Sequence, residues 1–506
     1  MPSTLFSYNL VGVLGSVASL ILASILGRIF YRIWFHPLSR FPGPPLLAAS
    51  GLPYAYLNSL SGTWFKTVAS LTRQYGPAVR IGPNHIALDG SIGWTEVYNR
   101  RERGDEELSK LFGGTVEEMD NLFWAPREQH RRQRRQLGTA LSASNLQQQE
   151  STIARYVHLL LYQLAEKAKA GEPVDIVKWL NYTTFDIIGD LTVSESFECL
   201  TTDTYHPWVR AAFDGIRIIT LRQLFQTYPL LGALIRYLNL SQSLSNASEM
   251  RNYVSEKSKS RIESIKRSQA GSFDLTAYML RDTPGGPMTE PEIMATTPTL
   301  LFAGSETTAT ALAGFCFQVA RHKQVYETLA AEVRGAFAGK SEITFRSTAS
   351  LQYLHAVIDE VLRVYPPAVE TPARLANGNV ICGIFVPAGT RISVSQWSTF
   401  RNPENFVEPN AFIPERWLSE THPRYDARFR HDNKDAFKPF GHGPRDCIGK
   451  NLAQAEMRYM IAHLLVAFDF SLEPGQDAWF DKQRAFFVWE KGPLYLRLQP
   501  RRVEQA

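Results

Sequence analysis

The chain has 506 residues, of which 44% are hydrophobic and 20% are charged, with a formal net charge of +5. This balance supports a large buried core, excludes a bundle of membrane spans, and gives no support to nucleic-acid binding. The four cysteines, at positions 199, 316, 382 and 447, form no CxxC pair. Such wide spacing argues against a structural zinc site and a disulfide framework, so we expect reduced thiols, mostly in the core.

An uncharged apolar segment opens the chain, and residues 10–26 read LVGVLGSVASLILASIL. A spanning helix needs roughly 20 residues, which predicts a transmembrane anchor over 10–31 after a short non-cytosolic N-terminus, 1–9. Arg28 and Arg32 follow the apolar run, and this flanking positive charge places the rest of the chain in the cytosol. A cleaved signal peptide is the alternative, but it would carry its positive charges before the apolar run.

A basic, proline-rich stretch over residues 32–45 follows the anchor and includes the sequence FPGPP. Proline and glycine packed this closely cannot continue a helix, so we expect a stiff hinge. The rest of the chain, residues 46–506, shows no repeat and no low-complexity linker, and we expect it to form one domain. Its first strand-like stretch is 78–89, and helical patterns dominate beyond it.

A long helix is predicted over about 290–322. Thr289 and Glu292 have the spacing of a capping box, which marks a helix start. Pro298 lies inside this helix. Because proline lacks a backbone N–H and crowds the preceding turn, we expect a bend or an opening there.

A second helix is predicted over about 350–365, where apolar residues recur at helical spacing before two prolines. Strand-like stretches lie near 380–395 and 485–498, and a third helix begins at about Gly449. Long helices with a few short strands predict a mainly α fold with small β-sheets.

A glycine-rich loop, residues 440–449, reads FGHGPRDCIG and precedes the third helix. Gly441 and Gly443 favour a tight turn, which leaves Cys447 at the mouth of the helix. Free backbone N–H groups and the helix dipole are expected to lower the pKa of this thiol, with Arg445 adding positive charge. On this ground alone, a core cysteine, a nucleophile and a metal ligand all remain open.

The full pattern of the loop narrows that choice. The spacing F-x-x-G-x-R-x-C-x-G is matched at every fixed position, by Phe440, Gly443, Arg445, Cys447 and Gly449. It closely resembles the heme-binding signature of the cytochrome P450 family, the heme-thiolate monooxygenases.

Three further motifs occur in the order that this family shows. Residues 303–308, AGSETT, resemble the family's oxygen-side motif A-G-x-[DE]-T-[TS]. Glu360 and Arg363 match its E-x-x-R, and residues 414–417 read PERW. The resemblance covers roughly residues 40–500 and implies one mainly α domain, with small β-sheets, around a buried heme b.

The resemblance implies a role for each motif. Cys447 becomes the axial thiolate ligand of the heme iron, in a cofactor-binding loop with Phe440, Arg445 and Gly449. Glu306 and Thr307 become the catalytic residues, which relay the protons that oxygen activation consumes. Beside them, Gly304 is expected to leave room next to Ala303.

A second group is implied to be structural: Glu360, Arg363 and Arg416 are expected to form a buried ion network. The heme propionates need basic partners, and the family places these at His130 and Arg134, which share one helix face. Further candidates are Arg374, Arg445 and His442.

A solvated basic face is the plain alternative for the run 130–135, and both interpretations fit. Arg131, Arg132 and Arg135 point away from His130 and are expected to dock an acidic reductase. No flavin-binding region is evident, so electrons must come from a separate partner. The resemblance implies NADPH-cytochrome P450 reductase of the endoplasmic reticulum membrane, with cytochrome b5 as a further candidate and the single-pass protein's catalytic domain in the cytosol.

The substrate pocket should be lined by apolar or small residues at positions that match the family's: Phe112, Leu300, Ala303, Ala368, Val369, Phe486 and Phe487. Such a lining favours a hydrophobic small molecule, with hydroxylation as the expected reaction. The segments RIWFHPLSRFPGP and FGHGPRDCIGKNLAQAEMR are similar to those of fungal members that make secondary metabolites, such as polyketides, terpenoids or alkaloids. Two alternatives are a heme-thiolate isomerase or dehydratase, and a non-catalytic membrane heme-binding protein.

Overall fold

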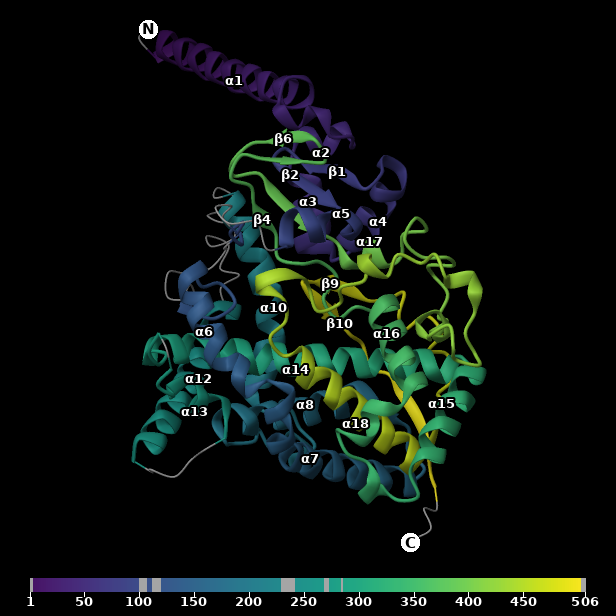
Figure 1. Ribbon diagram of the computed structural model, residues 1–506. Helices are drawn as coiled ribbons and strands as arrows, with labels where there is room; N and C mark the ends of the chain where they lie inside the picture. The colour runs from purple at the N-terminus through teal and green to yellow at the C-terminus, as the bar shows by residue number, and fades with distance from the viewer. Residues whose placement is uncertain are drawn as a thin grey trace.

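The computed structural model describes residues 3–99, 107–111, 120–228, 242–267, 273–283 and 285–501. Most of them are helical, as predicted, and the strands form small sheets (Figure 1). The helices are α1 (Ser3–Trp34), α2 (Pro45–Ala49), α3 (Leu52–Ala55), α4 (Trp64–Tyr75), α5 (Gly90–Gly93), α6 (Arg127–Ala140), α7 (Ala143–Lys169), α8 (Ile176–Val193), α9 (Cys199–Thr202), α10 (Pro207–Thr227), α12 (Gln242–Arg267), α13 (Leu275–Leu280), α14 (Glu290–Arg321), α15 (Lys323–Ala336), α16 (Gln352–Val364), α17 (Gln396–Phe400) and α18 (Lys450–Ala467).

The predicted strand-like stretches are all confirmed, and the stretches 78–89 and 380–395 meet in one sheet through the strands His85–Leu88 and Arg391–Val394. The strands are β1 (Ala78–Gly82), β2 (His85–Leu88), β3 (Val174–Asp175), β4 (Arg374–Leu375), β5 (Asn379–Ile381), β6 (Ile384–Val386), β7 (Arg391–Val394), β8 (Phe468–Leu472), β9 (Arg484–Phe486), β10 (Val488–Glu490) and β11 (Tyr495–Pro500). The largest sheet has the order β1-β2-β7-β4, in which only β2 and β7 are parallel. A three-stranded sheet, β3-β11-β8, and two hairpins, β5-β6 and β9-β10, complete the set.

Helix α1 projects from the body at the end where α2, β1 and β6 lie (Figure 1). Its stretch Gly12–Trp34 is long and apolar enough to span a membrane, and none of it is buried. The helix continues to Trp34, beyond the predicted end of the anchor at residue 31, because Arg32 and Trp34 are compatible with helix and no proline occurs until Pro37. The helix suggests a membrane anchor.

The segment after α1 is tied to the body. Arg80 of β1 is buried, and its Nη1 donates to the carbonyl of Arg32 at 2.7 Å. The Arg80 backbone N–H donates to the carbonyl of Pro42 at 2.8 Å. Gly43 lies so close to Arg80 that a Cβ there would be 2.3 Å from its carbonyl oxygen. The predicted stiff break is therefore held by specific contacts with β1.

Helix α14 crosses the middle of the body (Figure 1). It also passes a length and hydropathy test for a membrane span, but 78% of its apolar window is buried, which marks it as a core helix. The predicted capping box is present, since Thr289 N–H donates to Glu292 at 2.8 Å and Glu292 N–H to the Thr289 hydroxyl at 3.4 Å. Its helical span continues without interruption across Pro298.

Candidate active site

The cysteine loop folds back on itself before α18. Gly443 has φ of 78°, and a Cβ at this position would meet the Tyr98 carbonyl oxygen at 1.8 Å, so only glycine fits. The Cys447 backbone N–H donates to the Phe440 carbonyl at 2.8 Å and closes the turn. Gly449 caps α18, which places Cys447 two residues before the helix mouth.

The surroundings of Cys447 correct one expectation. Burial among protein atoms raises the pKa of its thiol, whereas the Gly449 backbone N–H and the more distant charge of Arg134 lower it. The prediction that the helix mouth gives this thiol a lowered pKa is therefore wrong, because desolvation outweighs the helix. Cys447 is nevertheless an exposed residue by its solvent-accessible surface.

One face of α14 is open in the same way. Ala303 is exposed and Thr307, one turn later, is half-buried, although the helix around them is mostly covered. The Thr307 hydroxyl donates to the Ala303 carbonyl at 2.7 Å. Gly304 does not serve this face as expected. It lets α8 approach instead, since a Cβ there would be 2.8 Å from the Ile188 side chain.

Glu306 points away from that open face. Its side chain is fully buried and forms an ion pair with Lys491, the residue after β10. The Thr310 hydroxyl donates to Glu306 Oε1 at 3.1 Å and accepts from Lys491 Nζ at 2.5 Å. Burial raises the pKa of Glu306, while the charge of Lys491 opposes that rise.

The structure brings Glu360, Arg363 and Arg416 together in a solvent-free network. Arg363 donates to both oxygens of Glu360, at 2.7 and 2.8 Å, and Arg416 Nε donates to Glu360 Oε1 at 3.2 Å. Asp432, which the sequence did not indicate, accepts from Arg416 Nη1 at 2.5 Å. Trp417 Nε1 also donates to Glu360, at 2.9 Å.

The four expected propionate partners also meet in one place. Burial, followed by the charges of Arg445, Lys110, Arg134 and Arg374, lowers the pKa of His130 to about 3. His442, the remaining candidate, is half-buried in the cysteine loop.

Lys110 was not predicted in this cluster. Its Nζ donates to the Phe123 carbonyl at 2.9 Å and lies 3.6 Å from the centre of that ring. Burial, and next the charges of Arg374 and Arg445, hold the pKa of Lys110 well below its usual value. The cluster is therefore crowded with positive charge.

Two described carboxylates pair with this cluster. Arg445 Nε pairs with Glu107 at 2.5 Å, and Arg134 pairs with Asp446. Arg374 has two nitrogens, Nε and Nη1, that are buried without a hydrogen-bond partner, and Glu107 Oε1 is 3.9 Å from Nη1. Buried guanidinium nitrogens without partners call for an anionic ligand.

The expected pocket residues differ in exposure. Ala303 is exposed and Ala368 half-buried, whereas Leu300, Val369 and Phe486 are almost fully covered. Phe112 lies outside the described residues. Their role as a lining stays a prediction.

Phe487 forms the tip of the β9–β10 hairpin. It has φ of 76°, which is strained for a bulky residue, and its side chain is 43% exposed. Its ring lies edge-on to that of Phe123, with 6.3 Å between the centres. Phe487 thus lies next to Phe123, whose ring contacts Lys110 of the cationic cluster.

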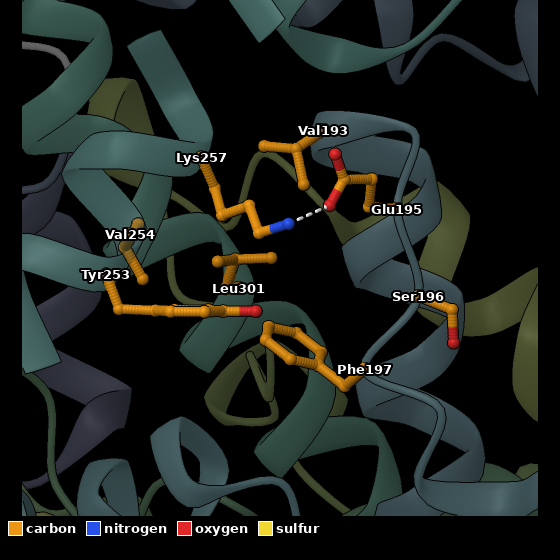
Figure 2. Close-up of a pocket in the computed structure, with 8 residues that line it drawn as sticks. All are labelled: Val193, Glu195, Ser196, Phe197, Tyr253, Val254, Lys257 and Leu301. Carbon is orange, nitrogen blue, oxygen red and sulfur yellow. Dashed lines mark hydrogen bonds and ion pairs between the residues drawn. The ribbon is translucent and has the colours of Figure 1, made fainter. Parts of the chain in front are cut away.

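A small cavity of about 20 Å³ lies elsewhere, between the end of α8, the start of the next segment, α12 and α14 (Figure 2). The ion pair between Lys257 and Glu195 closes one side, and Leu301 and Phe197 lie along it. None of the predicted site residues lines it, so it is a separate feature.

Comparison with known proteins decides the family. The family model described as Cytochrome P450 matches residues 56–498. The chain belongs to the cytochrome P450 family. It is a monooxygenase and an oxidoreductase, as the resemblance implied.

Fungal P450s resemble it over almost their whole length. The cytochrome P450 monooxygenase astJ of Aspergillus oryzae is 38% identical over 486 residues, which cover 95% of each chain. The cytochrome P450 monooxygenase lcsI of Purpureocillium lilacinum is 38% identical over 500 residues, covering 96% of this chain and 94% of the relative. The trichothecene C-15 hydroxylase of Fusarium sporotrichioides is 36% identical over 503 residues, covering 98% of this chain and all of the relative.

Membership of the P450 family implies a heme-thiolate cofactor. The residues present fit such a group. Cys447 is exposed, and the cationic cluster, in which two Arg374 nitrogens are buried without hydrogen-bond partners, suits a ligand that carries two carboxylates. On α14, Ala303 is exposed and Thr307 is half-buried.

Three residues of this P450 site were missed: Lys110, Asp432 and Lys491. None of them belongs to a local motif, and Lys491 pairs with a residue 185 positions away. No signal in the sequence indicated Lys491. A lysine directly after a β-hairpin is usually exposed, so its position did not suggest a buried ion pair.

Proposed function

We propose that this P450 is a membrane-anchored monooxygenase of fungal secondary metabolism that hydroxylates a hydrophobic small molecule. The single observation that carries the proposal is the exposed Cys447 in a loop whose Asp446 pairs with Arg134 of the cationic cluster. Residues 46–506 would form the catalytic domain and residues 10–31 the anchor, joined through the hinge at 32–45.

Cys447 would ligate the heme iron, with Phe440 beside the sulfur and Gly449 admitting the close turn. The heme, when bound, supplies oxygen activation, which a thiolate ligand favours by pushing electron density onto iron. His130, Arg134, Arg374, Arg445 and Lys110 would hold the propionates. The protein's task is thus to fix the cofactor and to shape the space beside it.

Glu306 and Thr307 would supply protons. The Thr307 hydroxyl is on the open face and can turn from the Ala303 carbonyl to a group in the pocket. Glu306 keeps one buried oxygen, Oε2, without a hydrogen-bond partner, so a proton can be held there. A positioned acid and hydroxyl of this kind typically contribute 10²–10⁴-fold to a rate.

The network of Glu360, Arg363 and Arg416 would hold the side of the domain beneath the cysteine loop. All three side chains are fully buried, and Arg363 also donates to the carbonyls of Phe400 and Pro409, at 2.9 and 2.6 Å. Such contacts fix loop segments that contain little regular structure. We therefore assign this network to folding and heme retention, not to chemistry.

The family implies a reductase partner and a small-molecule substrate. We assign the electron donor as NADPH-cytochrome P450 reductase, with cytochrome b5 as a second donor, at the endoplasmic reticulum. Arg131 and Arg135 are exposed on α6 and suit an acidic partner. Arg132 does not, because it is turned to Glu292 and the Pro287 carbonyl; its expected docking role is corrected.

The pocket composition and the relatives support the substrate class. Ala303, Ala368 and Phe487 offer an apolar or small surface, which suits a polyketide, terpenoid or alkaloid intermediate. One relative is named a trichothecene C-15 hydroxylase, which favours hydroxylation as the reaction.

The test is disruption of the gene, followed by incubation of the accumulating metabolite with the protein and a reductase in microsomes. Conversion that requires NADPH and O2 is expected. Conversion without either would instead indicate an isomerase or dehydratase. Bound heme without reductase-dependent O2 consumption would indicate a non-catalytic heme-binding protein.

A further inference from the structure

Glu306 and Lys491 form an ion pair that is removed from solvent. Their side chains are 0% and 3% exposed, and they join the middle of α14 to the segment after β10. Thr310 lies one turn beyond Glu306 and bonds to both partners. An isolated charge in such a place would be strongly unfavourable, so each group depends on the other.

The contacts to Glu306 are one-sided. Lys491 and Thr310 both meet Oε1, whereas Oε2 is buried and has no hydrogen-bond partner. Leaving a buried acceptor unsatisfied is unfavourable. An arrangement that fixes one carboxylate oxygen and leaves the other free is suited to a group that accepts and releases a proton.

Lys491 is held firmly by its hairpin. Trp489, two residues earlier, is buried and its Nε1 donates to the Pro366 carbonyl at 2.7 Å. Val488 forms a backbone bridge to Ala368. The β9–β10 hairpin, which carries Phe487, therefore also fixes the position of the Lys491 ammonium group.

Glu306 and Lys491 act on each other's charge. Burial raises the pKa of Glu306 and lowers the pKa of Lys491, while the charge of each partner opposes the shift of the other. Tyr365 and Tyr205 also face this carboxyl. Burial raises the pKa of Tyr205 to about 12 and that of Tyr365 further, so neither tyrosine ionises near neutral pH.

We propose that Lys491 is the positioning residue for Glu306: it binds one carboxylate oxygen, keeps the carboxylate ionised, and leaves the second oxygen free to accept a proton. This inference rests on the proposed function, in which Glu306 is a proton relay. It adds a residue from the C-terminal hairpin to a site otherwise built from α14.

The first test reads the charge of Glu306 directly. Infrared spectra of the purified heme-bound protein are recorded for wild type, Lys491→Met and Lys491→Arg, with Glu306→Gln to assign the carboxyl band. We expect no protonated-carboxyl band from Glu306 at pH 7 in wild type or Lys491→Arg, and its appearance in Lys491→Met. A Glu306 band of equal size in wild type overturns the inference.

The second test needs no identified substrate. Reduction of O2 to water consumes twice as many protons and electrons as reduction to hydrogen peroxide, so the ratio of NADPH to O2 consumed reports proton delivery. With reductase and no substrate, Lys491→Met should lower this ratio and raise peroxide, and higher pH should restore part of the ratio by ionising Glu306. Lys491→Arg should stay close to wild type. Lys482→Met, an exposed lysine nearby, is the matched control.

The double variant Glu306→Gln/Lys491→Met separates positioning from a structural role. It leaves no unpaired buried charge, so it should fold even if Lys491→Met does not, and its NADPH-to-O2 ratio should equal that of Glu306→Gln alone. A further drop in the double variant would show a role for Lys491 independent of Glu306 and overturn the inference. If Glu306→Gln itself leaves the ratio unchanged, the proposed relay fails; if Glu306→Gln lowers it and Lys491→Met does not, only the inference fails.

Discussion

Arg416 and Glu360 form an ion pair that is fully excluded from solvent, with 3.2 Å between Nε and Oε1. Glu360 lies on α16 and Arg416 lies in the PERW turn, Pro414–Trp417. Strands β4 to β7 lie between these two segments in the sequence. Because Arg416 also holds Asp432, it joins three parts of the chain around buried charges. A pair of this kind costs much to break from one side.

Replacing Arg416 with Met should therefore be severe. It leaves Glu360 and Asp432 with less compensating charge inside the core, and we expect a loss of about 3–5 kcal/mol in the free energy of unfolding, with loss of heme. Urea unfolding and heme content measure this. Arg430→Met removes an exposed pair with Glu420 and should leave the melting temperature nearly unchanged. Equal stability of the two variants would contradict the structural role.

Cys447→Ser should abolish the long-wavelength absorption band of the ferrous carbon monoxide complex and NADPH-dependent turnover. The hydroxyl is a far poorer anionic ligand than a thiolate, while its smaller size is tolerated at an exposed side chain. Difference spectra on protein that retains its circular dichroism provide the measurement. Cys382→Ser is the control, because this half-buried thiol lies in the β5–β6 turn and should keep the band.

Lys110→Met and Arg374→Met should each weaken heme retention. A hydrogen bond to a charged group contributes about 1.5–3 kcal/mol, so transfer of heme to an acceptor protein should become roughly 10-fold easier or more. The matched control is Arg131→Met, an exposed arginine on α6 that pairs with Glu128 at 3.2 Å. Unchanged heme transfer in both cluster variants would argue against propionate binding here.

Glu456 of α18 should make stability depend on pH. Burial raises its pKa from 4.5 to about 8, and Thr308 bonds to it. Since the folded pKa is the higher one, its stabilising contribution is complete below about pH 4.5 and is lost as the pH rises to about 8. Glu456→Gln should remove that slope and raise stability at pH 8 by a few kcal/mol. Melting temperatures across this range test it; a slope equal to wild type would contradict the assignment.

Deletion of residues 3–34 should release the protein from membranes. Gly12–Trp34 is an exposed stretch of the N-terminal helix that is long and apolar enough to span a membrane. Flotation of cell membranes measures the bound fraction, and a fluorescent fusion of the full chain tests residence in the endoplasmic reticulum. Full membrane binding after deletion would show that another surface carries the attachment.

The sequence predicted those features that are encoded locally. The capping box at Thr289, the glycine turn before Cys447 and the limits of α16 and α18 depend on residues within a few positions of one another. Pairings between distant positions were predicted only where a family motif marks the residues, as for Glu360 and Arg416. Lys491 pairs with Glu306, 185 positions away, and Lys110 lies beside the charges of Arg374 and Arg445. No pattern in the sequence around either lysine indicates these contacts.

Two errors have a common physical origin. The thiol of Cys447 was expected to have a lowered pKa because a helix begins nearby, and Gly304 was expected to clear the open face of α14. Both arguments considered only the local backbone. Burial decides the first, and the approach of α8 through Ile188 decides the second. Such effects depend on which elements pack together.

The contacts of Arg80 have a mechanical consequence for the whole protein. Its side chain donates to the Arg32 carbonyl at the end of α1, and its backbone N–H donates to the Pro42 carbonyl. These bonds restrict the orientation of α1 relative to the body. The orientation of the body is therefore expected to follow the tilt of α1 in a bilayer. A change in membrane thickness would thus rotate the four-stranded sheet relative to the lipid headgroups, and with it the direction from which a lipid-dissolved molecule first meets the protein.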